Sequence, residues 1–595
     1  MVWKDGRSMN KPWLTHYDPK MKESVEYPEK SMYEMLLRTV KSFPSRVAIS
    51  FEGSSMSYEA MLGQVETVSE RLKSLGIGKG DVLTICLPNI PQAVIVFYAA
   101  NKLGIIANMV HPKTPPDELS EFMTSTNSRY LIILDAFMFK SLPVFERIGV
   151  KKVIVARIGD YLSPVKRAAF FIAKGRKIPP TPEHERFVAW RELLISGAKG
   201  LDKSEKAAPY ERQIEPHDPA VYLHSGGTTG TPKTIVLSSH NMNVLAMIGP
   251  QIVNIDDPFE TGMIPAGLSM AAILPLFHGF GLCMCMHTMV CNGIETILVP
   301  LFTPDSLAKV ILRDKPSFIA AVPTLFEAIL KSKKLEKKRL PFLKACFCGG
   351  DSLSPDLKTR FETFLRERGA PLSLREGYGL TETVTVCSVN PEYQSKEGSV
   401  GLPIPDVLMK IVHVGTNQEL SPGGQGEICV SGPTVMLGYL NDPDGTEEAI
   451  HIHEDGLPWV HTGDYGYMDK DGYFFFTQRL KRIIKVSGVP VFPSQIEAII
   501  SSVPGVGSVC AIAIPDPYRM HAVKAVVVPD AGGKSDGEEA VRERIMDVCG
   551  DKLIAYARPV EIEFRESLPK TLVGKIDYVL LEKQELEKRA PIQSV

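Results

Sequence analysis

The sequence predicts an α/β protein in which a large N-terminal domain of parallel-rich βαβ sheets is joined by a hinge to a small α+β C-terminal lid domain. Two observations support this class: apolar strand-like runs alternate with helical patterns after Val47, and the alternation changes after Arg479. The chain has 595 residues, 44% of them hydrophobic, which is enough for one large core and a second domain. We therefore expect domains at 1–479 and 480–595.

The N-terminal rhythm is clearest between residues 81 and 158. One segment predicts a helix, PQAVIVFYAANKLG (91–104), and three predict strands, DVLTICL (81–87), YLIILD (130–135) and KKVIVARI (151–158). Apolar strands separated by helices are typical of a parallel sheet with helices on both faces.

The C-terminal segment has a different order. A strand, a loop and a helix in LKRIIKVSGVPVFPSQIEAIISSV follow Arg479. Two further strands, VCAIAIPD (509–516) and KAVVVPD (524–530), precede a helix in EEAVRERIMDVC (538–549). This order predicts a small α+β unit that moves about a hinge.

Composition argues against several functions. The net charge of −2 and the lack of a base-reading motif argue against nucleic-acid binding. No clean run of about 20 apolar residues predicts a membrane span, and the polar N-terminus is unlike a secretory signal. None of the ten cysteines is spaced as CxxC, so we expect buried, reduced thiols rather than a zinc site, and a cytoplasmic location.

The segment 163–180, SPVKRAAFFIAKGRKIPP, has two interpretations. It carries five cations, no acid and an apolar AAFFIA centre. One interpretation is an interfacial helix that contacts a membrane surface, and the other is an ordinary solvated surface helix.

The strongest local motif is YLHSGGTTGTPKTIVLSSHN (222–241). Glycines allow a tight turn, hydroxyls donate hydrogen bonds, and Lys233 adds a cation, which together suit a polyphosphate. The loop does not fit G-x-x-x-x-G-K-[ST] in any register, so it is not a Walker A loop. The expected phosphate-binding residues are Ser225, Gly226, Gly227, Thr228, Thr229, Gly230 and Lys233.

SGGTTGTPK resembles the phosphate loop of the adenylate-forming superfamily, which contains acyl-CoA synthetases, adenylation domains and luciferases. Further similar segments follow in the family's order: ACFCGGDSLSPDL (345–357), REGYGLTETVT (375–385), HTGDYGYMDKDGYFFF (461–476), TQRLKRIIK (477–485) and SLPKTLVGKIDY (567–578). The resemblance covers about residues 30–590 and is strongest to bacterial-type long-chain fatty acyl-CoA synthetases.

The resemblance implies a role for each motif residue in binding ATP. Gly349, Gly350 and Asp351 would line the adenine and Tyr378 would stack on it. Thr381 would bond phosphate or acyl oxygens, and Glu382 would hold Mg²⁺. Asp464 would accept both ribose hydroxyls, with Arg479 nearby. GGDSL also suggests a phosphopantetheine-bearing Ser352, but no helical carrier module surrounds it.

The resemblance also implies the residues of the acid, the hinge and the thiol. His278 in LPLFHGFGL would separate the nucleotide from the acyl pocket, with a core histidine as the alternative. Lys575 would align the carboxylate against the α-phosphate. Lys481 would be the hinge, and Gly488 would let the pantetheine arm of CoA pass close to the backbone.

These roles imply a ligase that converts a fatty acid, ATP and CoA into acyl-CoA, AMP and pyrophosphate. Alternatives are a medium-chain or aryl-CoA ligase, an acyl-AMP ligase that loads a carrier protein, and a lipid-binding protein that has lost activity. The N-terminal arm (1–30) suggests a homodimer. The chain departs from the family pattern at Thr234, Gln478, Arg482 and Met520–His521.

Overall fold

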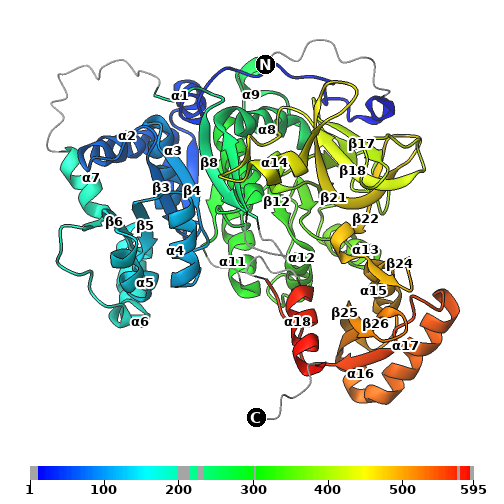
Figure 1. The fold of residues 1–595 in the computed structure, drawn as a ribbon. Helices are drawn as coiled ribbons and strands as arrows, with labels where there is room; N and C mark the ends of the chain where they lie inside the picture. The colour runs from blue at the N-terminus through cyan, green and yellow to red at the C-terminus, as the bar shows by residue number, and fades with distance from the viewer. Residues whose placement is uncertain (1–10, 199–212, 226–232, 301–302, 572–575, 590–595) are drawn as a thin grey trace.

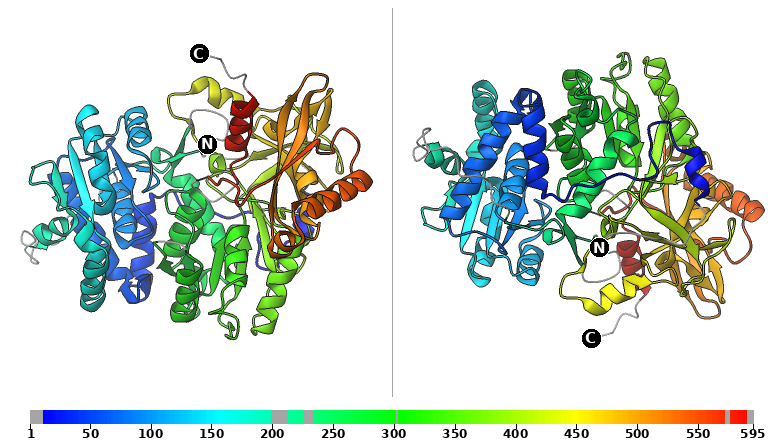
Figure 2. Two further views of the ribbon diagram at one scale, coloured as in Figure 1. Left: turned by 90° about the horizontal axis from the view of Figure 1, so that it is seen from below. Right: turned by 90° about the horizontal axis from the view of Figure 1, so that it is seen from above.

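The computed structural model describes residues 11–198, 213–225, 233–300, 303–571 and 576–589. Figure 1 shows two α/β regions side by side, an antiparallel sheet next to them, and the C-terminal domain below. The views from below and above in Figure 2 show that the first α/β region, the second and the antiparallel sheet follow one another in a row. The predicted α/β class is confirmed.

The first sheet has eight strands and is mainly parallel. Its strands β3, β5 and β6 confirm the three predicted between residues 81 and 158. In spatial order the sheet runs β19 (Gly438–Tyr439), β9 (Thr234–Ser238), β8 (Pro219–His224), β4 (Ile106–Met109), β3 (Val82–Cys86), β5 (Tyr130–Leu134), β6 (Lys152–Ala156) and β7 (Phe187–Ala189).

The second sheet has nine strands, and its centre, from β14 to β1, is parallel. The carboxyl ends of these central strands therefore meet at one edge. Its order is β16 (Leu402–Pro403), β15 (Ser388–Val389), β14 (Leu374–Tyr378), β13 (Ala345–Cys348), β12 (Phe318–Ala321), β10 (Ser269–Ala272), β11 (Glu295–Leu298), β1 (Val47–Phe51) and β2 (Ser54–Ser57).

The third sheet is antiparallel and ends at the predicted domain boundary. It contains β17 (Leu408–Val412), β18 (Gln425–Ser431), β21 (Pro458–Met468), β20 (Ile450–Ile452) and β22 (Phe474–Arg479).

Helices cover the sheets of the N-terminal domain. The α-helices are α1 (Met32–Ser42), α2 (Tyr58–Ser74), α3 (Pro91–Lys102), α4 (Pro116–Ser125), α5 (Asp135–Arg147), α6 (Pro164–Ala173), α7 (Trp190–Ala198), α8 (Ser239–Ile252), α9 (Pro258–Thr261), α10 (Thr288–Cys291), α11 (Pro304–Asp314), α12 (Pro323–Leu330), α13 (Pro355–Glu367) and α14 (Pro443–Ala449). Single turns are η1 (Pro12–His16), η2 (Ile158–Asp160), η3 (Gly175–Lys177), η5 (Thr381–Thr383) and η6 (Leu480–Arg482), and η4 (Phe280–His287) is π-helical.

The predicted helix at 91–104 is α3, which lies in the middle of the core. It is apolar on all sides, and every residue from Pro91 to Asn101 is buried. A helix that is apolar all round needs neighbours on every face. It contacts helices α1 and α2 and strands β3 and β4. Pro91 starts the helix at a position where the missing N–H costs nothing.

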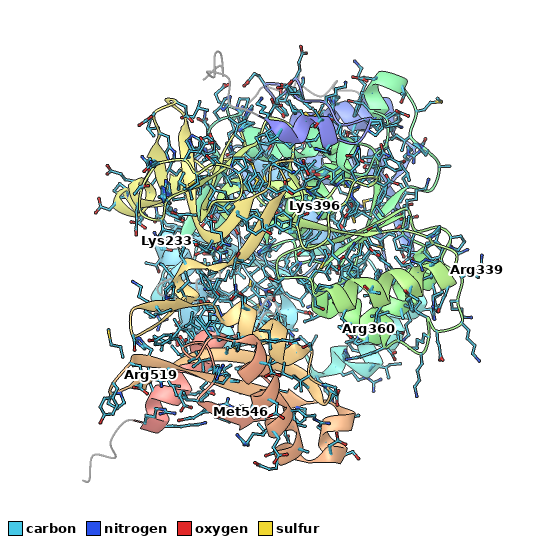
Figure 3. All side chains as sticks on the ribbon, turned by 90° about the vertical axis from the view of Figure 1, so that its right-hand side faces the viewer. Lys233, Arg339, Arg360, Lys396, Arg519 and Met546 are labelled. Atoms are coloured by element: carbon cyan, nitrogen blue, oxygen red, sulfur yellow. The ribbon has the colours of Figure 1, made fainter. Side chains whose placement is uncertain are left out.

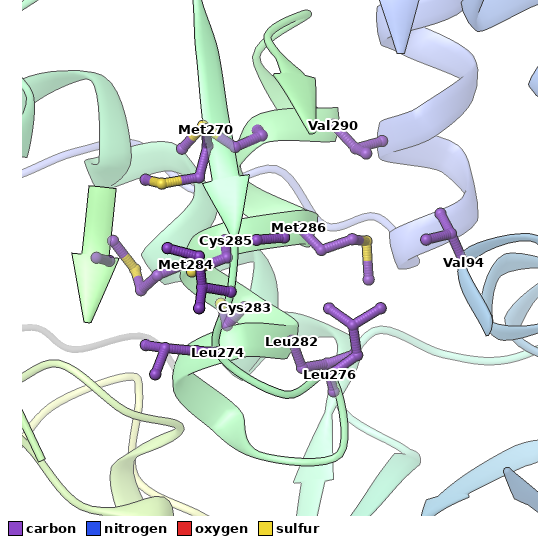
Figure 4. Packing of buried hydrophobic residues seen from close by; sticks show 14 of the residues in the cluster. Val94, Met270, Leu274, Leu276, Leu282, Cys283, Met284, Cys285, Met286 and Val290 are labelled. Atoms are coloured by element: carbon purple, nitrogen blue, oxygen red, sulfur yellow. The ribbon is translucent and has the colours of Figure 1, made fainter. Parts of the chain in front are cut away.

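The centre of the N-terminal domain is packed with sulfur-containing and branched side chains. Figure 4 shows Met270, Cys283, Met284, Cys285 and Met286 gathered around η4 and β10. All ten cysteines are buried and free, which confirms the predicted buried thiols. No helix in the described ranges is both long and apolar enough to cross a membrane.

The C-terminal domain has its own core. A hairpin of β23 (Ile484–Val486) and β24 (Val489–Val491) precedes a sheet of β25 (Val506–Asp516), β26 (Met520–Pro529) and β27 (Glu561–Phe564). The helices are α15 (Pro493–Ser501), α16 (Ala531–Asp536), α17 (Glu538–Lys552) and α18 (Tyr578–Arg589). One apolar cluster of this domain runs from Ile484 to Ile562. Figure 3 labels Arg519 and Met546, which lie on the surface of the same domain. The predicted boundary after Arg479 lies just before this cluster, and movement about it stays a prediction.

Two segments at the surface were singled out in the sequence. Helix α6 contains no buried residue, and its Val165, Phe171 and Ile172 are exposed. The described part of the N-terminal arm packs on its own chain: Trp13 is buried against Leu402 and Tyr473.

Candidate functional site

A cavity lies between the two domains. The N-terminal domain contributes His278, Gly350 and Asp464 to its wall, and the C-terminal domain contributes Thr571 and Tyr578. A cavity lined by both domains changes shape when one domain moves relative to the other.

One corner of the cavity is organised around Asp464. The cross-strand register of β21 and β22 places Asp464 opposite Arg479, whose Nε lies 3.0 Å from the Asp464 Oδ1. The Tyr378 hydroxyl donates to the other oxygen at 2.6 Å. The carboxylate raises the pKa of Arg479, and burial raises the pKa of Tyr378. A carboxylate has about four acceptor positions, so oxygen lone pairs remain for two hydroxyls of a ligand.

A second group of polar side chains surrounds Glu382 in η5. The Tyr439 hydroxyl donates to Glu382 Oε1 at 2.9 Å. The Lys233 ammonium lies 4.3 Å from the centre of the Tyr439 ring and 3.6 Å from Asp442. Thr381, Glu382, Lys233 and Tyr439 all line the cavity. The group therefore combines an oriented carboxylate with a cation that suits a phosphate.

The predicted phosphate loop is closed at its base. The Ser225 amide donates to the Lys233 carbonyl at 2.9 Å, and the Lys233 amide donates to the Ser225 hydroxyl at 3.0 Å. Gly226, Gly227, Thr228, Thr229 and Gly230 lie outside the described residues, so their roles remain predictions. The Thr234 hydroxyl forms a hydrogen bond with Nδ1 of the half-buried His224 at 3.1 Å, which gives the hydroxyl a role at this departure from the family pattern.

The predicted adenine wall follows the end of β13. Gly349, Gly350 and Asp351 line the cavity beside Tyr378. Gly350 has a φ of +80°, which a side chain would strain. The Tyr378 ring stacks on Phe476 at 6.3 Å between ring centres. An aromatic ring and a glycine turn together leave room for a flat base.

The predicted acid side is a loop that packs tightly on the turn after Glu382. His278 and Phe280 line the cavity. A Cβ on Gly279 would stand 2.0 Å from the Val384 carbonyl oxygen, so only glycine fits there. Val384 itself has a φ of +65°, which is strained for a β-branched residue.

One part of the lining of the same cavity, here called the apolar arm, consists of mostly buried residues of the core. Its wall is formed by Ile252, Val253, Met270, Met284 and Met289. Isoleucine and valine side chains form no hydrogen bonds, and a methionine sulfur accepts only weak ones, so this arm suits a hydrocarbon.

The residues predicted in the C-terminal domain differ in whether they lie at the cavity wall. Lys575 lies outside the described residues, but Thr571 before it and Ile576 after it line the cavity. Lys481 also lines the cavity. Gly488 does not appear in that wall and occupies the β23–β24 turn with a φ of +81°.

Two of the departures are at the hinge. Gln478 is buried and its Oε1 accepts from Ser494 of α15 at 3.3 Å. Arg482 pairs with Glu497 of α15. Gln478 therefore connects β22 to α15, and Arg482 connects η6 to the same helix. Met520, at the β25–β26 turn, is exposed with a φ of +64°.

Several residues of the cavity were given no role in the sequence analysis, although His224 and Glu376 lie within the segments 222–241 and 375–385. Burial lowers the pKa of His111 and His224 to about 4, and it raises that of Glu376 to about 7. Tyr439 lies within GEICVSGPTVMLGYLNDPDGTEEAI (426–450). This segment also resembles long-chain fatty acyl-CoA synthetases, and that resemblance was the only signal for Tyr439. The others become visible only when the strands are assembled.

Comparison with known families and proteins agrees with this geometry. Residues 36–440 match the model of the AMP-binding enzyme family, and residues 495–575 match that of the AMP-binding enzyme C-terminal domain. The chain belongs to the AMP-binding enzyme family. Within this AMP-binding enzyme, the second matched segment ends on Lys575, and Asp464, Arg479 and Lys481 lie between the two.

Curated relatives of this AMP-binding enzyme include ligases of more than one type. The chain is 31% identical over 572 residues to a long-chain-fatty-acid–CoA ligase of Bacillus subtilis (strain 168), covering 95% of this chain and 96% of the relative. It is 30% identical over 562 residues to a probable 4-coumarate–CoA ligase of Dictyostelium discoideum, covering 93% and 95%.

Solved structures confirm the fold of this AMP-binding enzyme. An anthranilate CoA ligase, AuaEII, in complex with anthranoyl-AMP has a TM-score of 0.80 at 22% identity and covers 96% of this chain and 100% of its own. ATP-bound MatB from Rhodopseudomonas palustris has a TM-score of 0.78 at 22% identity, with coverage of 94% and 99%.

Proposed function

We propose that this AMP-binding enzyme converts a long-chain fatty acid, ATP and CoA into acyl-CoA, AMP and pyrophosphate. The observation that carries the proposal is one cavity in which the Asp464 corner, Glu382 and both ends of the Lys575 segment meet beside an apolar arm. The group around Asp464 suits a nucleoside. The group around Glu382, which includes the Lys233 cation, suits a phosphate, and the apolar arm suits an alkyl chain.

In the first half-reaction, the chain positions two anions that repel each other. Asp464 accepts the ribose hydroxyls while Arg479 and Tyr378 fix its orientation. Lys233 and the loop 225–233 hold the phosphates. Lys575 contacts the substrate carboxylate and the α-phosphate, so that a carboxylate oxygen attacks phosphorus and pyrophosphate leaves.

Glu382 fits the role of the Mg²⁺ ligand. Tyr439 holds its Oε1 and leaves Oε2 available at the cavity wall. Mg²⁺ prefers carboxylate and phosphate oxygens, and when bound it would neutralise phosphate charge. Thr381 lines the cavity next to that carboxylate, where its hydroxyl would bond phosphate or acyl oxygens.

In the second half-reaction, the C-terminal domain rotates about Lys481. The rotation withdraws Lys575 and brings the Gly488 turn to the cavity. A Cβ on Gly488 would meet nothing within 4 Å here, so its φ of +81°, rather than crowding, requires glycine in this arrangement. The CoA thiolate attacks the acyl carbonyl, a thioester forms and AMP leaves.

The length of the acid is the finer part of the proposal. The apolar arm between β10, η4 and α10 supports an alkyl chain, as do the long-chain-fatty-acid–CoA ligases among the relatives. A medium-chain or aryl acid is the second candidate, which the 4-coumarate–CoA ligases favour. An acyl-AMP ligase that loads a carrier protein is the third.

A membrane surface is a further proposed partner. Helix α6 exposes Val165, Phe171 and Ile172 within a segment of five cations and no acid. Such a helix suits an anionic lipid surface from which a fatty acid is taken. A homodimer and a cytoplasmic location complete the proposal.

A carboxylic-acid screen with ATP and CoA tests the function, with AMP release as the measured product. Saturated acids of increasing length and coumarate-type acids are compared with and without CoA. Highest kcat/KM on long acids, with AMP release that requires CoA, supports the proposal. Preference for aromatic acids contradicts the chain length, and ATP–pyrophosphate exchange without CoA-dependent turnover points to a carrier protein.

A further inference from the structure

A group of imidazole, thiol and carboxylate side chains lies on one face of the antiparallel sheet. Cys429 of β18 and His461 of β21 are cross-strand partners, and His453 follows β20 at the edge of the same sheet. The ligating atoms of these three residues all lie within 4.8 Å of one another. The three side chains are almost completely buried.

The two imidazoles face each other with nitrogen atoms that bind metals. Nε2 of His453 lies 3.0 Å from Nε2 of His461. Nδ1 of His453 is buried without a hydrogen-bond partner. A hydrogen bond between two imidazoles accounts for the first contact but leaves both the second nitrogen and the nearby sulfur unused.

Glu427 gives this group the outer shell that is typical of a metal site. Its Oε2 lies 3.0 Å from Nδ1 of His461, on the side of the ring away from His453. A carboxylate that holds one imidazole nitrogen directs the lone pair of the other toward a metal. The other oxygen, Oε1, accepts from the Gly463 amide at 2.9 Å, so Glu427 is itself fixed.

We infer that Cys429, His453 and His461 form a Zn²⁺ site. One thiolate and two imidazoles are a ligand set that zinc prefers, and three protein ligands leave one tetrahedral position. His461 and His451 also line the large cavity, which gives water access to that position. Binding releases the Cys429 thiol proton to solvent.

The inferred site does not depend on the proposed reaction, but it lies next to the nucleotide corner. His461 is three residues before Asp464 on β21, and Glu427 contacts both His461 and the intervening Gly463. Bound zinc therefore links three strand segments of the wall that carries Asp464. The spacing of cysteines along the chain did not predict this zinc site. Its three ligands come from segments that are separate in sequence and meet only in the folded sheet.

Metal analysis of the full-length chain tests the site. The protein is stripped with a chelator, reloaded with Zn²⁺, freed of unbound metal and assayed by mass spectrometry for zinc. We expect one equivalent in the wild type and its loss in the C429A/H453Q variant. Glu427→Gln is expected to weaken zinc binding by about ten- to a hundredfold.

Cobalt substitution identifies the thiolate without relying on the variants. Co²⁺ bound to Cys429 gives a near-ultraviolet thiolate-to-metal charge-transfer band in the wild type. His217→Gln is the matched control, because His217 belongs to an exposed group with Glu29 and His240 that has no thiol, and it is expected to keep the band. Failure of the wild type to retain zinc or to show the band overturns the inference and leaves a hydrogen-bonded histidine pair.

Discussion

Arg482 forms a bidentate ion pair with Glu497, in which Nη1 donates to Oε2 at 3.1 Å and Nη2 donates to Oε1. The guanidinium also lies 4.9 Å from the centre of the Tyr578 ring. The hinge turn, helix α15 and the start of α18 are thus joined by one cation. Tyr578 is three residues after Lys575, so this contact lies close in sequence to the proposed catalytic lysine.

Loss of this ion pair is expected to impair adenylation more than thioester formation. Glu497→Gln removes one partner of a largely buried pair and should cost about 2–3 kcal/mol of C-terminal-domain stability. ATP–pyrophosphate exchange should fall more than the rate of CoA acylation from supplied acyl-AMP. Arg482→Lys, which keeps the charge without the fork, should fall between wild type and Glu497→Gln. Equal loss in both half-reactions would show a purely structural role.

Lys575→Ala should abolish ATP–pyrophosphate exchange and spare thioester formation from supplied acyl-AMP. The ammonium is needed only while two anions approach each other. Lys570→Ala, on the other side of the same segment, is the matched control and should keep exchange. Normal exchange in Lys575→Ala would refute the proposed role.

Asp464→Asn should weaken ATP binding. Asparagine offers one acceptor oxygen in place of a charged pair and leaves Arg479 without its carboxylate, so an affinity loss of about ten- to a hundredfold is expected. Calorimetric titration with ATP measures it. Asp444→Asn, an exposed residue of α14, should bind ATP like the wild type. Unchanged affinity in Asp464→Asn would place the ribose elsewhere.

The stability of the fold should decrease as the pH rises, because of Glu376. Burial raises the pKa of this carboxyl from 4.5 to about 7, so the folded chain binds more protons than the unfolded chain between these values. The stabilisation is fully present below pH 4.5 and is lost as the pH rises through about 7, by up to about 3 kcal/mol. Glu376→Gln should lack this slope when melting is compared at pH 5 and pH 8. An equal change in melting temperature between pH 5 and pH 8 in the wild type and in Glu376→Gln would contradict the role given to Glu376.

Met284→Trp should shift the preferred acid toward shorter chains. The larger side chain shortens the apolar arm, and each methylene that no longer fits forfeits about 0.8 kcal/mol of binding. The kcat/KM profile over acids of increasing length measures the shift. Met263→Trp is the control, because Met263 is 73% exposed. A uniform loss at every length would indicate misfolding of the core rather than a shorter arm.

The sequence was most informative where a local pattern decides the structure. Apolar runs such as 81–87 and 91–104 predicted β3 and α3 to within two residues, because burial on every side leaves a periodic or continuous apolar signature. Motif residues such as Asp464 and Glu382 were found because they lie in recognisable strings.

Residues that act through long-range contacts were not predictable in this way. Tyr439 reaches Glu382 across 57 positions, and His224 meets Asn108 across 116. Glu376 is an ordinary strand residue until neighbouring segments bury it. The Cys429–His461 pair depends on strand register, which the spacing of residues along the chain does not show.

The close approach of Gly279 to the Val384 carbonyl has a consequence for engineering. The loop that faces the acid and the turn that carries Glu382 pack so closely at this point that no side-chain atom fits between them. Libraries that randomise 278–281 alone would consist largely of unfolded members, whatever acid they were meant to accept. A Cβ on Gly281 would likewise stand 2.1 Å from the Pro275 carbonyl oxygen. Varying 278 and 280 together with 381–385, with Gly279 and Gly281 kept, should raise the fraction of folded clones and make new acids accessible.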